Sequence, residues 1–319
     1  MLDNLLYSVN AIFPIFLLVI FGAILGKCGK ITDSFTEAAD WLVFKVALPI
    51  MLFLEIAHCE LSENVDLKLI LFLVISVTSS FFAISVIVAL TVKDNSKRGA
   101  LIQGICRSNF AILGVPLAVN MFGEVGGQAI AVAMPFVILM FNSYSVVVLS
   151  IFSEKKENKF TKKTLLGILK NVVTNPLIIG VLLGIPFMIF HIELPSFANK
   201  TLTYLSNLTT PLALLSLGAN FKVESLKGRV GYAIVGSIGK TIILPAIAVT
   251  AAALIGLRGP SLGVVLICFG APTAVSSYIM AKKMGNDHEL AGQILLLSTF
   301  LCVITIFVGI FILKTLAFI

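Results

Sequence analysis

Charged side chains are scarce in this sequence, and no long hydrophilic segment interrupts it. Only 12% of the 319 residues are charged, 58% are hydrophobic, and the mean hydropathy is +1.06. A soluble domain needs far more polar surface than this composition provides. The longest hydrophilic run covers only residues 153–163. The composition therefore predicts a polytopic membrane protein with nearly all of its mass in the bilayer.

Motifs that carry enzymatic or metal chemistry are also missing. The sequence has no HExxH, GxxxxGK, paired-aspartate motif or Ser/Lys dyad, and its three histidines fall at loop edges. The five cysteines show no CxxC spacing, so we expect them to act as small packing residues. We therefore expect neither an enzyme nor an ATP-driven pump, and no resident metal or cofactor. Residues 1–7 lack the basic segment of a signal peptide, so the first apolar span should be retained.

Ten apolar stretches of membrane-spanning length follow one another along the chain. They cover approximately residues 8–26, 35–57, 67–92, 99–121, 126–152, 164–190, 195–219, 231–257, 259–284 and 289–314. Fifteen basic residues lie in one set of connections, against four on the other face. The positive-inside rule places the fifteen in the cytoplasm, which puts both termini on the outer side of a cell (inner) membrane. These loop positions also explain the net charge of +7 without a nucleic-acid partner.

The second half of the chain repeats the first at an offset of 162 residues. The matched pairs are Pro14 and Pro176, Gly22 and Gly184, Ser34 and Ser196, Phe35 and Phe197, and Pro49 and Pro211. Each repeat then holds five spans, and an odd number inverts the second copy relative to the membrane. The predicted fold is all-α, with two inverted five-helix repeats at residues 1–152 and 164–319. A short cytoplasmic loop at residues 153–163 joins them.

Spans four and nine are both interrupted by glycine, proline and small polar residues. Proline removes a backbone donor and glycine eases unwinding, so both helices should break within the membrane. Matching breaks in two inverted repeats are typical of the substrate site of a secondary transporter, and half-helix N-termini favour an anion. The alternative is that these residues mark only kinks or close packing. For Pro49 and Pro211, a moving hinge and a static kink are equally compatible with the sequence.

Three basic residues lie deep in apolar spans, where an ionised group is expensive. They are Lys45, Arg107 and Lys240. No Asp or Glu is placed convincingly at mid-depth, because Glu55 falls near the outer end of its span. The missing partner is therefore predicted to be an anionic substrate. The alternative is that the cations pair with backbone carbonyls, Asp40 or Glu55.

The interrupted spans resemble those of the auxin efflux carrier family, whose bacterial members include malate and malonate permeases. The resemblance rests on residues 107–117 (RSNFAILGVPL), 271–278 (APTAVSSY) and 46–49 (VALP). It implies that broken helices 4 and 9 cross, and that a scaffold domain and a transport domain each draw on both repeats. It also implies elevator-type carriage of organic anions, and homodimers formed through the scaffold. The long cytoplasmic loop of plant members is absent, and Lys45 stands where many relatives should have an uncharged residue.

On these grounds the sequence predicts a secondary transporter of small mono- or dicarboxylates. The resemblance implies that Asn109 binds the carboxylate, and Arg107 should supply positive field beside it. The predicted substrate-binding residues are Asn109, Arg107, Gly114, Pro116, Gly270, Pro272, Thr273 and Ser276. Four further residues are assigned supporting or gating roles: Lys45, Pro49, Pro211 and Lys240.

Two other functions are compatible with the sequence. One is a sodium-coupled organic-anion symporter of the bile-acid type, because the hydroxyls of Thr273, Ser276 and Ser277 can hold Na⁺ without a carboxylate. The scarcity of buried acids counts mildly against it and also against a proton relay, so coupling to Na⁺ or H⁺ stays open. The other is a carboxylate sensor that does not transport, which the absence of a cytoplasmic output domain disfavours.

Overall fold

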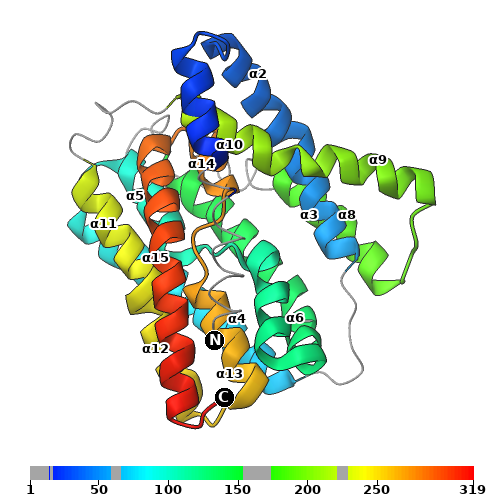
Figure 1. Ribbon diagram of the computed structural model, residues 1–319, viewed down its shortest axis with the longest axis vertical. Helices are drawn as coiled ribbons and strands as arrows, with labels where there is room; N and C mark the ends of the chain where they lie inside the picture. The colour runs from blue at the N-terminus through cyan, green and yellow to red at the C-terminus, as the bar shows by residue number, and fades with distance from the viewer. Residues whose placement is uncertain (1–13, 15–16, 59–65, 154–173, 221–228) are drawn as a thin grey trace, which may run out of the picture.

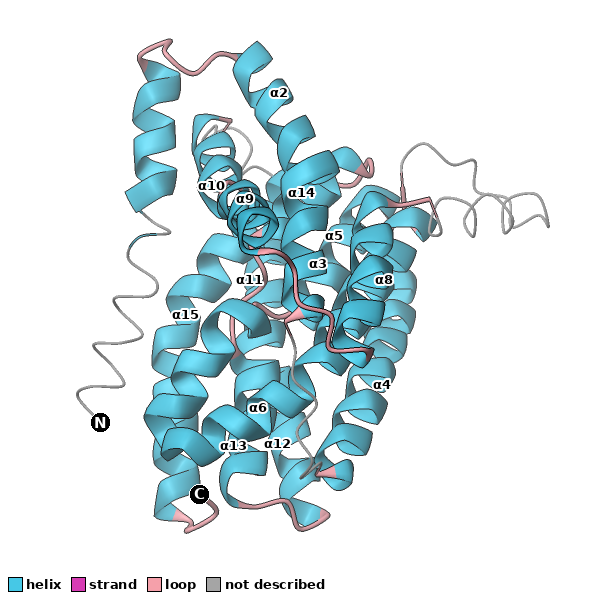
Figure 2. Ribbon diagram, turned by 90° about the vertical axis from the view of Figure 1, so that its right-hand side faces the viewer, coloured by secondary structure: helices cyan, strands magenta, loops and turns pink. Residues whose placement is uncertain are grey.

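The computed structural model describes residues 14, 17–58, 66–153, 174–220 and 229–319. In this part of the chain all regular secondary structure is helical (Figure 2). Four helices are long and apolar enough to cross a membrane, namely Leu67–Thr91, Met121–Ile151, Val230–Leu254 and His288–Thr315. Three apolar helices are shorter, namely Leu17–Lys27, Pro176–Ile189 and Gly259–Gly270. The prediction of a helical membrane protein is therefore confirmed, whereas the count of ten spans stays a prediction. Most of the predicted loop at 153–163 lies outside the described residues.

Several predicted spans are divided into shorter helical elements. After Leu17–Lys27 come α2 (Asp33–Leu42), the π-helical turn η1 (Val43–Ala47), α3 (Leu48–Ala57), α4 (Leu67–Thr91), α5 (Asn95–Cys106), α6 (Phe110–Ile151), α8 (Pro176–Ile189), α9 (Ser196–Asn207), α10 (Thr209–Ala219), α11 (Val230–Ile238), the π-helical turn η3 (Gly239–Ile243), α12 (Leu244–Leu254), α13 (Gly259–Gly270), α14 (Ser276–Lys283) and α15 (His288–Thr315). A positive φ of 63° at Gly123 bends α6 where the sequence separates spans four and five. In span seven, α9 and α10 meet at Leu208, so the break comes before Pro211.

The described helices form two groups that pack mainly within themselves (Figure 1). One group, called the α3 group, consists of Leu17–Lys27, α2, η1, α3, α8, α9 and α10 and occupies the top and right of Figure 1. The other, called the α6 group, consists of α4, α5, α6, α11, η3, α12, α13, α14 and α15. Contacts between the two groups are sparse and involve mainly α6 and α14. Both groups draw on both halves of the chain.

A buried ion pair joins the two groups. Asp40 of α2 is fully buried, and its Oδ2 lies 2.5 Å from Nζ of Lys282 in α14. The hydroxyl of Ser216 in α10 donates to Oδ1 of Asp40 at 2.6 Å. A carboxylate removed from water is costly unless it is both paired and hydrogen-bonded, and Asp40 has both kinds of partner. This contact therefore ties α2 and α10 to α14.

Glycines bring helix pairs of the α3 group into backbone contact. A Cβ added to Gly184 of α8 would lie 2.8 Å from the carbonyl oxygen of Phe53 in α3. A Cβ added to Gly22 would lie 2.4 Å from the carbonyl oxygen of Leu215 in α10. Small residues at such seams allow close approach of membrane helices. The second contact repeats the first at the offset of 162 residues that the sequence shows.

Two π-helical turns each contain a lysine and precede a proline. Lys45 lies in η1, shortly before Pro49, and Lys240 lies in η3, shortly before Pro245. Proline has no N–H to donate to the carbonyl four residues earlier, so the α-helical ladder is interrupted. The backbone instead forms hydrogen bonds to the carbonyl five residues earlier. The N–H of Leu48 donates to the carbonyl of Val43, and the N–H of Leu244 donates to the carbonyl of Gly239. The irregularity expected at Pro49 is thus a widened turn just before the proline.

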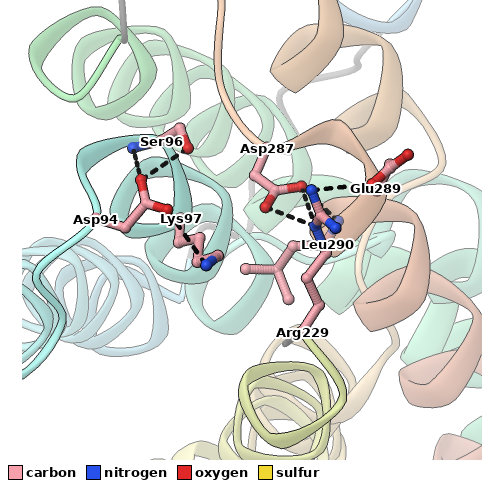
Figure 3. A network of polar contacts seen from close by, with 7 residues as sticks. All are labelled: Asp94, Ser96, Lys97, Arg229, Asp287, Glu289 and Leu290. Atoms are coloured by element: carbon pink, nitrogen blue, oxygen red, sulfur yellow. Dashed lines mark hydrogen bonds and ion pairs between the residues drawn. The ribbon is translucent and has the colours of Figure 1, made fainter. Parts of the chain in front are cut away.

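Polar contacts gather where the predicted cytoplasmic loops meet (Figure 3). Nε of Arg229, just before α11, donates to both carboxylate oxygens of Asp287 at 3.0 and 2.8 Å. The guanidinium also lies 3.0 Å from a carboxylate oxygen of Glu289 in α15. The backbone N–H of Asp287 donates to the carbonyl of Ser96 in α5. Loops that the sequence assigns to one membrane face therefore lie together in the structure.

The start of α5 carries its own cap at this end. The carboxylate of Asp94 accepts hydrogen bonds from the N–H and the hydroxyl of Ser96, and it lies 3.2 Å from Nζ of Lys97. Partial burial alone would raise the pKa of Asp94, but the hydrogen bonds from Ser96 and the pairing with Lys97 together lower it. Asp94 is therefore ionised at neutral pH and caps the helix as a charged acceptor.

The glycine seam predicts a specific sensitivity to added side-chain volume. We expect Gly184→Leu to lower the unfolding temperature in detergent and to destabilise the protein by about 1–3 kcal/mol, because the new side chain meets the α3 backbone. The matched control is Gly231→Leu, where an added Cβ meets nothing within 4 Å. Equal thermal stability of the two variants would contradict the close packing of α8 on α3.

Candidate functional site

Both interrupted spans break, and the two breaks cross each other. Residues 107–109 are non-helical between α5 and α6, and residues 271–275 separate α13 from α14. The backbone N–H of Asn109 donates to the carbonyl of Pro272 at 2.8 Å. Each break therefore supplies a hydrogen-bond partner for the other, which satisfies backbone groups that hydrocarbon would leave unpaired.

Side-chain hydroxyls tie the crossing together. The hydroxyl of Thr273 donates to the carbonyl of Gly104 in α5 at 2.5 Å, and its N–H donates to the hydroxyl of Ser298 in α15 at 3.2 Å. The hydroxyl of Ser108 donates to the carbonyl of Ala271 at 3.4 Å. The Thr273 hydroxyl, which the sequence offers as a substrate contact, is thus already donated to the backbone of the opposite break.

A cavity of about 40 Å³ lies at the crossing, between the two helix groups. Its lining from the α3 group is Met51, Leu52, Glu55, Thr209 and Thr210, and its lining from the α6 group is Arg107, Ser108, Asn109, Phe110, Ile138, Phe141, Asn142, Ala274, Val275 and Ser276. A volume of this size has room for a few water molecules.

Arg107 is held at this cavity by hydrogen bonds to neutral groups. Its Nη2 donates to Oδ1 of Asn142 in α6 at 2.8 Å and to Oγ of Ser276 in α14 at 2.7 Å. Its Nη1 donates to Sδ of Met280, also in α14. The residue is only 4% exposed, so its charge is strongly desolvated. These contacts fix the guanidinium across both breaks without neutralising it.

Glu55 lines the same cavity and was not among the predicted site residues. It lies on the face of α3 that also presents Met51 and Leu52, and it interacts electrostatically with Arg107. The sequence offers Asp40 and Glu55 as alternative partners of the buried cations. The structure brings Glu55 near Arg107, whereas Asp40 pairs with Lys282. The position of Glu55 along its span does not show which side of the helix it faces. The helical spacing of Glu55 from Met51 could have indicated its direction.

Helix N-termini add positive potential to the cavity. α6 begins at Phe110 and α14 at Ser276, and both residues line the cavity. Neither N-terminus receives a side-chain capping hydrogen bond, and Asn109, at the N-cap position of α6, does not cap it with its amide. At α14 the N–H groups of Ser277 and Tyr278 donate to the carbonyls of Ala274 and Val275. Both N-termini still direct the positive end of a helix dipole toward the cavity, which favours an anion. The amide of Asn109 adds a neutral donor and acceptor beside them.

Lys240 lies outside the cavity lining. It is fully buried in η3, and within the described residues its Nζ has no hydrogen-bond partner. The thiols of Cys106, Cys268 and Cys302 are near enough to interact with it electrostatically. Since α5 ends at Cys106 and α13 ends two residues after Cys268, the ammonium lies beside two helix C-termini, which favour a cation.

The other predicted residues lie outside the cavity lining. Gly270 ends α13 at the crossing, and Gly114 is buried in α6, where an added Cβ would lie 2.6 Å from Ile130. Nothing is described of the Pro116 side chain. Pro49 and Pro211 lie in α3 and α10. Lys45 is exposed, with its Nζ 5.8 Å from the centre of the Phe44 ring.

The crossing predicts a stability effect that does not depend on function. We expect Thr273→Val to destabilise the protein by about 1–3 kcal/mol, because it leaves the buried carbonyl of Gly104 without its donor. The control is Thr273→Ser, which keeps the hydroxyl and should retain most of the stability. Unfolding temperatures in detergent measure both variants. A Thr273→Val variant as stable as the wild type would contradict the role of this hydrogen bond.

The sequence is similar to those of known transporters, and two of these similarities cover nearly the whole chain. The chain is 28% identical over 302 residues to an uncharacterized transporter of Methanocaldococcus jannaschii, covering 91% of this chain and 94% of that protein. It is 23% identical over 304 residues to a Rhizobium meliloti protein provisionally named a malonate transporter, covering 92% of each. It is 26% identical over 144 residues to a protein of Oryza sativa provisionally named auxin efflux carrier component 3b, covering 43% of this chain and 23% of that protein. Residues 7–310 match the family described as membrane transport protein, so the chain is a membrane transporter of this auxin efflux carrier-like family.

Proposed function

We propose that this transporter carries small organic anions, mono- or dicarboxylates, and binds them at the crossing of α5–α6 and α13–α14. One observation carries the proposal: the guanidinium of Arg107 and two uncapped helix N-termini meet in a single cavity. A buried cation surrounded by neutral hydrogen-bond partners favours an anionic ligand. The similarity to a protein provisionally named a malonate transporter is consistent with a carboxylate.

In this proposal Asn109 and the N-termini hold the carboxylate, and Arg107 supplies the positive field. Ser276 already accepts a hydrogen bond from Arg107, so its hydroxyl can donate to the substrate. Thr273, Gly270 and Pro272 act through the backbone of the crossing. The ammonium of Lys240 offsets the negative dipole ends at the C-termini of α5 and α13.

The two helix groups suggest how the substrate crosses the membrane. The cavity lies between them, and the contacts joining them are few. We assign the α3 group as the scaffold and the α6 group as the transport domain, which moves in an elevator fashion and carries the crossing with it. The paired glycine seams at an offset of 162 residues support two inverted repeats of five spans. Because the cavity measures only about 40 Å³, it must widen during this cycle to admit the substrate.

The orientation and assembly follow from the same proposal. The clustered basic loops around α5, α11 and α14 face the cytoplasm of a cell membrane, and both termini face outward. Homodimers would form through the α3 group. Transport measurements with a Na⁺ gradient and with a pH gradient identify whether Na⁺ or H⁺ is the coupling ion.

The test is uptake into proteoliposomes of labelled mono- and dicarboxylates, malonate among them. Uptake is measured without an ion gradient, with a Na⁺ gradient and with a pH gradient. Saturable uptake of carboxylates, inhibited by other carboxylates, is the expected result. A correctly folded protein that takes up no carboxylate under any of the three conditions would overturn the organic-anion assignment. Saturable binding without uptake would favour a sensor.

Replacement of Asn109 gives the sharpest prediction for this site. A hydrogen bond to a charged group contributes about 1.5–3 kcal/mol, so Asn109→Ala should raise KM roughly 10- to 150-fold. The backbone bond from Asn109 to Pro272 is kept, so the unfolding temperature should change little. Asn207→Ala, on the exposed end of α9, is the matched control. Wild-type transport by Asn109→Ala would show that Asn109 does not bind the substrate.

A further inference from the structure

We propose that Glu55 is a built-in competitor of the substrate for the positive field of Arg107. The inference rests on the proposed function and deepens it. Glu55 and Arg107 line one cavity, so the carboxylate of Glu55 acts on Arg107 where a substrate carboxylate would act. Substrate binding then requires that Glu55 take up a proton.

The geometry of the cavity supports this competition. Glu55 and Arg107 line the same space of about 40 Å³ and interact electrostatically. The described hydrogen bonds of Arg107 go to Asn142, Ser276 and Met280, which are neutral. Glu55 is therefore the acid that offsets this cation within the lining. A substrate carboxylate and the carboxylate of Glu55 in one cavity repel each other, which favours protonation of one of them.

The two charges belong to different helix groups. Glu55 is carried by α3, whereas Arg107 lies at the crossing in the α6 group. Movement of one group past the other must therefore change their separation. In the arrangement of this structure Glu55 assists release of the anion, because its carboxylate pairs again with Arg107 as the anion leaves. When the groups have moved apart, the same carboxylate no longer competes.

The surroundings of Glu55 identify which groups can affect its proton. On α3 itself the other titratable group nearby is His58, at the C-cap. Among the described elements packed on α3, α8 carries none, η1 carries Lys45 and α9 carries Lys200 and Tyr204. α6 carries Glu124 and Tyr144, and Tyr144 lies 3.0 Å from the hydroxyl of Thr78. Arg107 is the charged group that acts on Glu55 from across the cavity.

A pH dependence follows with a definite sign. Protonation removes the negative charge of Glu55, which then no longer competes with the substrate for Arg107. The affinity for the substrate should therefore be higher at low pH. As pH rises and Glu55 ionises, the substrate must displace a charged competitor. For one linked proton, KM then rises by up to about tenfold per pH unit.

The experiment measures KM for labelled malonate in proteoliposomes containing the full-length protein, over a pH range in which malonate is fully ionised. For the wild type we expect KM to rise with pH. For Glu55→Gln, which mimics the protonated side chain, we expect a KM that is independent of pH and no higher than the low-pH value of the wild type. Glu55→Asp should keep the pH dependence. Glu124→Gln, an exposed substitution of the same chemistry, should keep the wild-type profile.

Three results would overturn the inference while leaving the proposed function standing. One is saturable malonate uptake with the same KM and pH profile in Glu55→Gln and the wild type. The second is a Glu55→Gln variant whose KM is raised at every pH, since the carboxylate would then assist binding. The third is a flat pH profile in the wild type, which decides the question even if Glu55→Gln does not fold. Absence of saturable uptake of any carboxylate by folded wild-type protein would instead refute the proposed function itself.

Discussion

Hydrocarbon offers no hydrogen-bond partner to a backbone amide, so a helix that breaks within a membrane must find its partners in protein. In this transporter the two breaks find them in each other. Asn109 donates to the carbonyl of Pro272, and Thr273 donates to the carbonyl of Gly104. The position of Arg107, the direction of two half-helices and the cavity between the helix groups all depend on this crossing.

Two buried cations near the crossing have different surroundings. The guanidinium of Arg107 faces the cavity together with the N-termini of α6 and α14. Lys240 lies outside the cavity lining, and its charge interacts with the thiols of Cys106 and Cys268 near the C-terminal ends of α5 and α13. Each cation therefore has a different task in our proposal. Arg107 attracts a mobile anion, whereas Lys240 offsets fixed backbone dipoles.

The sequence predicts that spans four and nine break, but it locates only one of the breaks. Pro272 lies within the break at residues 271–275, so the cause of that break is local. Residues 107–109 contain neither glycine nor proline, whereas Gly114 and Pro116 lie inside α6, so the position of the first break depends on tertiary contacts such as the bond from Asn109 to Pro272. The partners of polar side chains depend on tertiary packing, which the sequence does not reveal. The pairing of Asp40 with Lys282 joins residues 242 positions apart, and the hydroxyl of Thr273 is taken by a distant carbonyl. The sequence left open whether Glu55 is a partner of the buried cations, because depth along a span does not determine the side that a residue faces.

The hydrogen bond from Asn109 to Pro272 has a consequence for the synthesis of the protein. The chain is made from its N-terminus, and Asn109 enters the membrane long before Pro272 leaves the ribosome. Until then the first break has no partner from the second half and must be shielded by water, by the insertion machinery or by non-native contacts. The first half is therefore an unfinished intermediate, and the crossing closes only after most of the chain has been inserted.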